Sequence, residues 1–195
     1  VSTQKLFSGL KRYGINTIRI PIAWSNMMVQ EKQSDGSTYY RINEAYFDRV
    51  EEVINYCLNE EMYVIINDHW DGQWWGMFGD ADLSVRAQAW KKYEDMWTQI
   101  ANRYIDYSDR LIFEGANEEL GERLNDNWKG TGGTKGVLTR KETYALTNEI
   151  NQKFVDIIRK SGINADGTKN NNYYRMLLIP GYDTVSYTHL TLPTT

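Results

Sequence analysis

The chain of 195 residues contains one cysteine, Cys57, and two histidines, His69 and His189. A single cysteine excludes a disulfide framework within the chain, and its place on the apolar stripe of an expected helix predicts a buried thiol. Two histidines exclude a histidine-rich metal centre, although carboxylates could still hold calcium. We therefore expect no metal in the site.

Basic residues are not in excess, because 22 Lys and Arg face 26 Asp and Glu and the net charge is −4. Nucleic acids and anionic membranes bind basic faces, so neither is an expected partner. No apolar run approaches the ~18 residues of a membrane span. The hydrophobic share of 41% and the charged share of 25% are ordinary for one globular domain.

Helical and strand patterns alternate four times. Apolar residues at helical spacing predict helices over 3–13, 43–60, 84–105 and 139–160. Gly14 is suited to end the first helix, and Thr139 with Glu142 forms a capping box that opens the last. Apolar runs predict strands over 15–22, 62–68, 110–116 and 174–181. The alternation predicts an α/β fold with a parallel sheet.

Two architectures fit this pattern, a doubly wound sheet and a (β/α)8 barrel. The segments that follow strands, 23–42, 69–83 and 117–138, are long and rich in polar and aromatic residues, as on the active-site face of a barrel. No G-x-G-x-x-G follows a strand, which disfavours dinucleotide binding. The glycine-rich KGTGGTKG at 129–136 lies far from any strand end and indicates a flexible loop. We predict an incomplete (β/α)8 TIM barrel.

Several polar residues fall where a strand ends and its loop begins. Glu118 follows the third strand and would lie at the mouth of a barrel, where burial or a second carboxylate can turn it into an acid near neutral pH. Position alone leaves open a solvated loop glutamate, which is what we expect Glu119 and Glu122 to be. Glu114, inside the strand, would be buried and need a partner. Arg19 on a neighbouring strand can supply it, so we expect a structural role for Glu114.

Aromatic residues are abundant, with seven Trp and fourteen Tyr. Some must pack in the core. His69 ends the second strand and could be a core histidine, but the aromatic loop that follows it favours a functional position. Within that loop Trp70, Trp74 and Trp75 suit a platform for the apolar faces of sugar rings, and Trp128 and Trp24 are weaker candidates of the same kind.

Four segments together resemble glycoside hydrolase family 5, the cellulase family: GINTIRIPIAW, MYVIINDHWDG, IANRYIDYSDRLIFEGANEE and YRMLLIPGYDT. The similarity runs from about residue 5 to 184. It implies a retaining (β/α)8 barrel enzyme of which this chain holds about strands 2 to 5 of 8. It also implies an endo-acting hydrolase of β-1,4-linked plant polysaccharide, most simply an endo-β-1,4-glucanase, that needs no cofactor.

The resemblance also assigns catalytic roles. Glu118 would be the acid/base, Asn117 would bond the sugar 2-hydroxyl, Arg19 would support the nucleophile, and His69 would line the cleavage subsite. The nucleophile glutamate of the seventh strand has no counterpart in this sequence, so this stretch alone is expected to be inactive. Family members usually have Pro after the acid/base, whereas this chain has Glu119, which we expect to alter the local loop geometry.

Two rival functions differ in class. The first is a non-catalytic carbohydrate-binding protein on a degenerate barrel, which the set of Asn117, Glu118, His69 and Arg19 disfavours. The second is a barrel enzyme of different chemistry. The paucity of histidine disfavours a metal-dependent enzyme of this kind, and the missing glycine-rich strand-end loop disfavours a phosphate-binding one. The substrate expected from the family is a polysaccharide or oligosaccharide, the complete protein is expected to be a monomer, and a secreted or cell-surface bacterial location is implied.

The composition shifts sharply after residue 184. The segment SYTHLTLPT within 185–195 resembles the translation of a transposase adapter used in sequencing libraries. We therefore expect a partial catalytic barrel over 1–184 and a non-native tail over 185–195, in which His189 has no biological meaning. The absence of an initiator Met agrees with a fragment.

Overall fold

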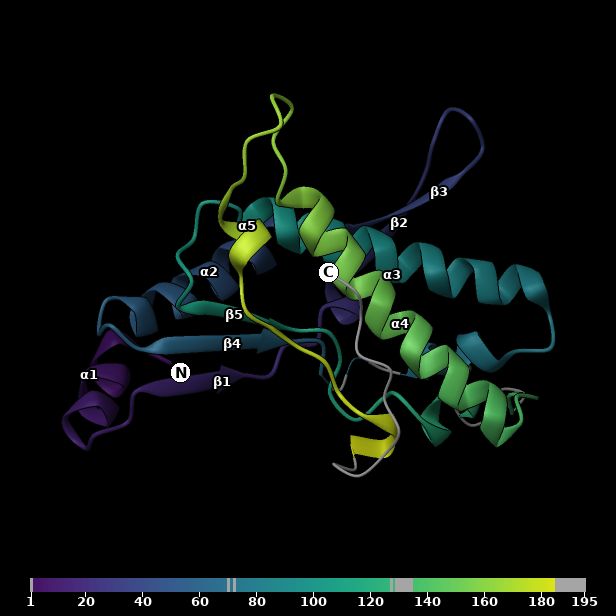
Figure 1. The fold of residues 1–195 in the computed structure, drawn as a ribbon, viewed down its shortest axis with the longest axis horizontal. Helices are drawn as coiled ribbons and strands as arrows, with labels where there is room; N and C mark the ends of the chain where they lie inside the picture. The colour runs from purple at the N-terminus through teal and green to yellow at the C-terminus, as the bar shows by residue number, and fades with distance from the viewer. Residues whose placement is uncertain (1, 70, 72, 127, 129–134, 185–195) are drawn as a thin grey trace.

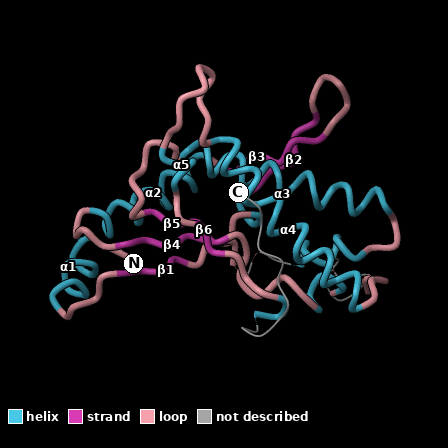
Figure 2. The backbone as a smooth tube through the Cα atoms, in the orientation of Figure 1, coloured by secondary structure: helices cyan, strands magenta, loops and turns pink. Residues whose placement is uncertain are grey.

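The computed structural model describes residues 2–69, 71, 73–126, 128 and 135–184. Four parallel strands form one sheet in the order β1-β4-β5-β6, and Figure 2 labels all four. Their bounds are Thr17–Ile20, Tyr63–Asn67, Leu111–Glu114 and Leu177–Leu178. The predicted α/β fold with a parallel sheet is confirmed. The predicted tail over 185–195 lies outside the described residues.

A helix precedes each strand of this sheet. The bounds are α1 Gln4–Arg12, α2 Glu44–Leu58, α3 Leu83–Arg103 and α4 Arg140–Ser161, with the short α5 Asn171–Tyr174 between α4 and β6. The four predicted helices are therefore confirmed, and α5 is an addition. Gly14 has φ 86° just beyond the end of α1, a conformation that glycine adopts freely. The capping box of Thr139 and Glu142 is formed at the start of α4.

Alternate strand residues point to opposite faces of the sheet, and the two faces differ in cover. Ile66 and Phe113 are paired in register and fully buried. Trp97 of α3 packs against both Phe113 and Phe154 of α4, with ring centroids 5.9 and 4.6 Å apart. The helices thus cover this face and enclose the core, while the opposite face carries polar groups such as Arg19.

The segment 23–42, predicted to be a long loop, contains an antiparallel hairpin of β2 Met28–Lys32 and β3 Thr38–Ile42. It is held against α3, because Asp95 accepts a hydrogen bond from the Tyr40 amide at 3.0 Å and Gln99 accepts one from the Ile42 amide at 3.0 Å. The hairpin projects beside α3 in Figure 1. Its turn is at Gly36, where φ is 83°.

Arg175, just before β6, joins the core layers. It is 1% exposed and donates hydrogen bonds to the carbonyls of Tyr104, Tyr107, Ser108 and Leu111. Burial lowers the pKa of its guanidinium to about 10. These bonds hold the residue that precedes β6 against the end of α3 and the start of β5, and so fix the amino ends of these two neighbouring strands relative to each other.

Candidate active site

The carboxyl ends of the parallel strands lie at one edge of the sheet, and the loops that follow them gather there (Figure 2). Arg19 comes from β1 and Glu114 is the last residue of β5. Asn117 and Glu118 lie in the loop that continues from β5. The relative positions of these four side chains therefore depend on the register of the strands as much as on the path of the loop.

Arg19 and Glu114 lie on the same face of the sheet. Arg19 pairs with Ile65 of β4, and Ile65 pairs with Ile112 of β5, two residues before Glu114. The two residues are separated by two strand spacings, roughly 10 Å, and by two residues along the strand, roughly 7 Å, and the arginine and glutamate side chains together bridge this separation. Arg19 Nε and Nη2 donate to the two carboxylate oxygens of Glu114 at 2.6 and 2.8 Å. The predicted partnership is confirmed.

The same guanidinium also positions Asn117. Arg19 Nη2 donates to Asn117 Oδ1 at 2.7 Å, which leaves the Asn117 amide NH2 group oriented away from Arg19. Asn117 is 8% exposed. The hydrogen bond to Glu114 raises the pKa of Arg19, so the guanidinium remains charged at any working pH. Arg19, Glu114 and Asn117 are thus joined by hydrogen bonds into one polar unit.

A cavity of about 340 Å³ opens beside this unit. Its lining is formed by Arg19, Glu114, Asn117, Glu118, Pro180, Gly181 and Thr184. The side chain of Glu118 is 55% exposed and contacts Arg123, whose Nη2 is 3.2 Å from Glu118 Oε2. Exposed ion pairs contribute only ~0–1 kcal/mol, so this contact does not prevent Glu118 from turning to a ligand in the cavity.

His69 lies at the same edge of the sheet but outside the lining of the cavity. Its backbone amide donates to the Ile22 carbonyl at 2.9 Å, and its Nδ1 is 3.3 Å from Nδ2 of Asn67. Partial burial and the charge of Arg19 lower the pKa of His69. The imidazole is therefore neutral at pH 7. In this state it can donate a hydrogen bond to a sugar hydroxyl or accept one from it.

Glu119 corrects one expectation. It was expected to be solvated, but it is 4% exposed and its Oε2 accepts a hydrogen bond from the Asn117 amide at 2.7 Å. Burial raises the pKa of this carboxyl. The residue that stands where the family usually has Pro thus closes a turn around Glu118. Glu122 is exposed, as expected.

Trp74 and Trp75 correct a second expectation. Both rings are buried, with 6% and 2% exposure, and they stack on each other at 4.6 Å. Trp75 also packs on Tyr93 of α3 at 5.7 Å, and Lys92 Nζ lies 4.9 Å from the Trp74 ring. The prediction of exposed rings is wrong for this pair, because the 3-10 helix Gln73–Gly79 turns them inward against α3. Trp70 lies outside the described residues.

The other two tryptophans differ from each other. Trp128 is half-buried and its Nε1 donates to Asp80 at 2.7 Å. Trp24 is 0% exposed and donates to the Asn67 carbonyl at 3.0 Å. Of these two described residues, Trp128 is the one that is partly exposed, and its role in binding sugar stays a prediction.

Two acidic residues that the sequence reasoning did not single out lie beneath the loops. Asp71 accepts hydrogen bonds from the backbone amides of Ser25 and Asn26 at 2.6 and 3.1 Å, which ties the loop after β4 to the loop after β1. Asp68 is fully buried, and neither carboxylate oxygen has a hydrogen-bond partner among the described residues. Burial and the charge of Asp71 raise the pKa of Asp68 well above its ordinary value.

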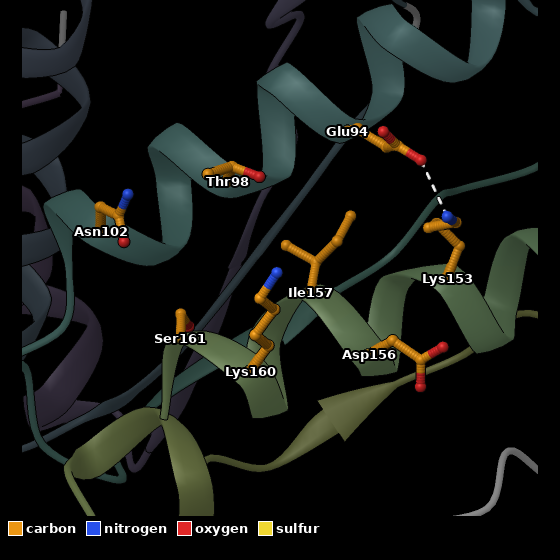
Figure 3. A pocket seen from close by; sticks show the side chains of 8 residues that line it. All are labelled: Glu94, Thr98, Asn102, Lys153, Asp156, Ile157, Lys160 and Ser161. Carbon is orange, nitrogen blue, oxygen red and sulfur yellow. Dashed lines mark ion pairs between the residues drawn. The ribbon is translucent and has the colours of Figure 1, made fainter. Parts of the chain in front are cut away.

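A second hollow, of about 460 Å³, lies between α3 and α4 (Figure 3). Lys153 and Glu94 form an ion pair of 2.8 Å at its rim. All of its lining residues come from these two helices, none from a strand or from a loop after a strand. The strand-end cavity is therefore the better candidate for chemistry. Among the described residues, no group of three or more His, Cys, Asp or Glu side chains is placed to hold a metal ion, and no helix is long and apolar enough to cross a membrane.

A parallel α/β sheet with a carboxylate, an amide and an arginine at its carboxyl edge defines an enzyme-like strand-end site. The family model Cellulase (glycosyl hydrolase family 5) matches residues 1–193, and the chain belongs to this family. The chain is 34% identical to a xyloglucan-specific endo-β-1,4-glucanase of Bacteroides ovatus and 32% identical to Endoglucanase A of Paenibacillus barcinonensis. It covers 33% and 41% of their lengths, and these matches include 96% and 95% of the chain.

Solved structures agree with this assignment. A GH5-4 broad specificity endoglucanase from Bacteroides salanitronis matches all of the chain with a TM-score of 0.76 and 33% identity. A mutant lichenase of a Caldicellulosiruptor species, in complex with cellotetraose, matches with a TM-score of 0.75 and 28% identity. The chain covers 48% of each. It thus matches TIM-barrel structures of the family over part of their length.

Proposed function

We propose that the complete protein is a retaining endo-β-1,4-glucanase, in which Glu118 is the general acid/base. The observation that carries this proposal is the cavity at the strand ends, where Glu118 is exposed beside the fixed unit of Arg19, Glu114 and Asn117. Relatives named as endoglucanases, and a family structure with cellotetraose, support a β-glucan substrate.

The proposed reaction is a double displacement. Glu118 donates its proton to the leaving glycosidic oxygen while a carboxylate nucleophile forms a bond to the anomeric carbon. The Glu118 carboxylate then takes a proton from a water molecule that attacks the same carbon and releases the nucleophile. Two inversions retain the anomeric configuration. The two carboxyl groups of such enzymes stand ~5–5.5 Å apart, and we propose that the nucleophile comes from a part of the protein that this chain does not include.

The other side chains bind and orient. Asn117, held through its Oδ1 by Arg19, presents its NH2 group for a sugar hydroxyl. Neutral His69 can bond a second hydroxyl at the same edge. Because a polysaccharide is too large to enter a cell intact, we propose that the enzyme acts outside it, as a secreted or surface protein.

The stereochemistry of the first product tests this proposal. The complete protein is incubated with a soluble β-1,4-glucan, and the anomeric configuration of new reducing ends is followed by proton NMR before mutarotation. The expected product is the β-anomer, together with a rapid fall in viscosity that marks internal cleavage. An α-anomer would exclude double displacement. Tight binding with no new reducing ends would favour a carbohydrate-binding protein instead.

A further inference from the structure

The loop that carries Glu118 is held at both of its ends. At the start, Glu119 accepts the hydrogen bond of the Asn117 amide. At the far end, the loop that follows β6 contacts it through Asp183 and the neighbouring Tyr182. The Asp183 amide donates to the Leu120 carbonyl at 2.7 Å, and Asp183 Oδ1 accepts from the Glu122 amide at 2.9 Å. Glu118 lies between these two sets of hydrogen bonds.

The contact is too close for any side chain at position 121. A Cβ added to Gly121 would lie 1.9 Å from Asp183 Oδ1 and 2.8 Å from the Asp183 amide nitrogen. Gly121 also has φ 146°, and Asp183 has φ 48°. Asp is one of the few residues other than Gly that enters the left-handed region without large cost. Both conformations are therefore matched to this one contact.

Asp183 is itself fixed to a helix through its neighbour. Tyr182 is 2% exposed, and its ring lies 4.2 Å from that of Tyr144 on α4. Its hydroxyl donates to Glu122 Oε1 at 3.0 Å. The loop after β6 therefore contacts both α4 and the loop after β5, whereas the Glu118 side chain itself makes an exposed ion pair with Arg123.

We infer that Asp183 is a positioning residue for Glu118: its carboxylate and amide together set the path of residues 120–122 and so place the acid/base against the leaving group. This inference rests on the proposed function of Glu118. Asp183 touches neither substrate nor the reacting atoms in this scheme. Misplacement of a catalytic group by about 1 Å can cost ~10²-fold in rate.

The test uses the complete protein and two substrates of the same sugar. An unactivated cello-oligosaccharide needs a proton on its leaving oxygen, whereas a dinitrophenyl glycoside does not, and kcat/KM reports the glycosylation step in both cases. The variant Asp183→Gly removes the side-chain acceptor but keeps the left-handed backbone accessible. We expect kcat/KM to fall by ~10–100-fold on the oligosaccharide and by less than about threefold on the dinitrophenyl glycoside.

Two further variants make the result specific. Asp183→Asn keeps an oxygen acceptor and tolerates positive φ, so it should restore kcat/KM on the oligosaccharide to within about threefold of the unmodified protein. Asp166→Ala is the matched control, because Asp166 Oδ1 also accepts a backbone amide, that of Thr168 at 2.9 Å, in an exposed turn between α4 and α5. Asp166→Ala should leave kcat/KM unchanged on both the oligosaccharide and the dinitrophenyl glycoside.

Equal losses on the two substrates would overturn the inference, as would no loss for Asp183→Gly or no rescue by Asp183→Asn. The melting temperature of each variant, and its active-site titre with the dinitrophenyl glycoside, normalise the rates to folded enzyme. Glu118→Ala separates the two claims. If it shows the acid-dependent loss and Asp183→Gly does not, only the inference fails, whereas insensitivity of both substrates to Glu118→Ala means that the proposed function has failed.

Discussion

Arg19 and Glu114, on strands separated by β4, are joined by two hydrogen bonds of 2.6 and 2.8 Å. The same guanidinium holds Asn117 at 2.7 Å. One side chain from the first strand therefore fixes both the end of β5 and the first polar residue of the loop that follows it. This relationship makes the site depend on the geometry of a guanidinium, which lysine cannot reproduce.

Replacement of Arg19 tests that dependence. Arg19→Lys keeps the charge but lacks the planar fork of donors that binds Glu114 and Asn117 together, and hydrogen bonds to charged groups contribute ~1.5–3 kcal/mol each. We expect kcat/KM of the complete enzyme to fall by about 10–100-fold with a smaller change in melting temperature. Steady-state kinetics on cello-oligosaccharide and thermal unfolding measure the two effects. Unchanged kinetics would show that Asn117 is placed by other contacts.

Trp75 should behave as a core residue. Trp75→Ala leaves a cavity against Tyr93 and Trp74, and loss of a large buried aromatic costs ~3–5 kcal/mol of unfolding free energy. Oligosaccharide affinity per folded molecule should stay the same. Denaturant unfolding and calorimetric titration separate stability from binding, with Tyr13→Ala as the control because Tyr13 is 89% exposed. A large loss of oligosaccharide affinity with normal stability would instead support a role of Trp75 in binding sugar.

Asp68 should weaken the fold at neutral pH. Its folded-state pKa is raised by burial and by Asp71, so the folded state binds a proton that the unfolded state has released above about pH 4. Stability should therefore fall as pH rises from about 4 towards the folded-state pKa. Asp68→Asn, which carries no charge, should gain on the order of 1–3 kcal/mol at pH 7.

The gain from Asp68→Asn should vanish below about pH 4, where Asp68 is protonated in both states. Glu119 and Lys92 also act on this carboxyl, the first raising its pKa and the second lowering it. Exposed Asp106 supplies the control, and Asp106→Asn should leave stability unchanged at each pH. Urea unfolding of the complete protein between pH 4 and 8 gives the measurement. A gain that does not depend on pH would contradict the assignment to a buried, protonated acid.

Periodicity is sufficient to predict the helices, most clearly α2, where Phe47, Val50, Ile54 and Cys57 are all buried. In α1 the pattern is weaker, because Phe7 is buried whereas Leu6 is 49% exposed. Periodicity also locates the four strands of the sheet and so brings Arg19 and Glu114 near each other, but of the predicted strand 174–181 only Leu177–Leu178 forms β6, and Tyr174 belongs to α5. The hairpin is not evident from the pattern, because β2 is mostly polar and the residues that β3 buries, Tyr40 and Ile42, are covered by the distant helix α3. The Asp35-Gly36 pair, a common hairpin turn, could have revealed it.

The burial of Trp74, Trp75 and Glu119 could not be predicted in the same way. A loop sequence rich in Trp and Gly does not state which way its rings turn, and here the 3-10 helix Gln73–Gly79 sets the direction. Glu119 is buried with its carboxylate accepting a hydrogen bond from the Asn117 backbone amide, a contact that the residue order does not reveal. The contact of Asp183 with Glu122 spans 61 residues and has no local signal. Such features depend on tertiary packing that pattern analysis does not contain.

The central claim is that Glu118 is the general acid/base, and Glu118→Ala in the complete enzyme tests it most directly. General acid/base catalysis contributes ~10²–10⁴-fold in rate. The expected result is a loss of that size in kcat/KM on cello-oligosaccharide, with kcat/KM on a dinitrophenyl glycoside nearly unchanged because its leaving group needs no proton. Near-native activity of Glu118→Ala on the oligosaccharide would contradict the assignment.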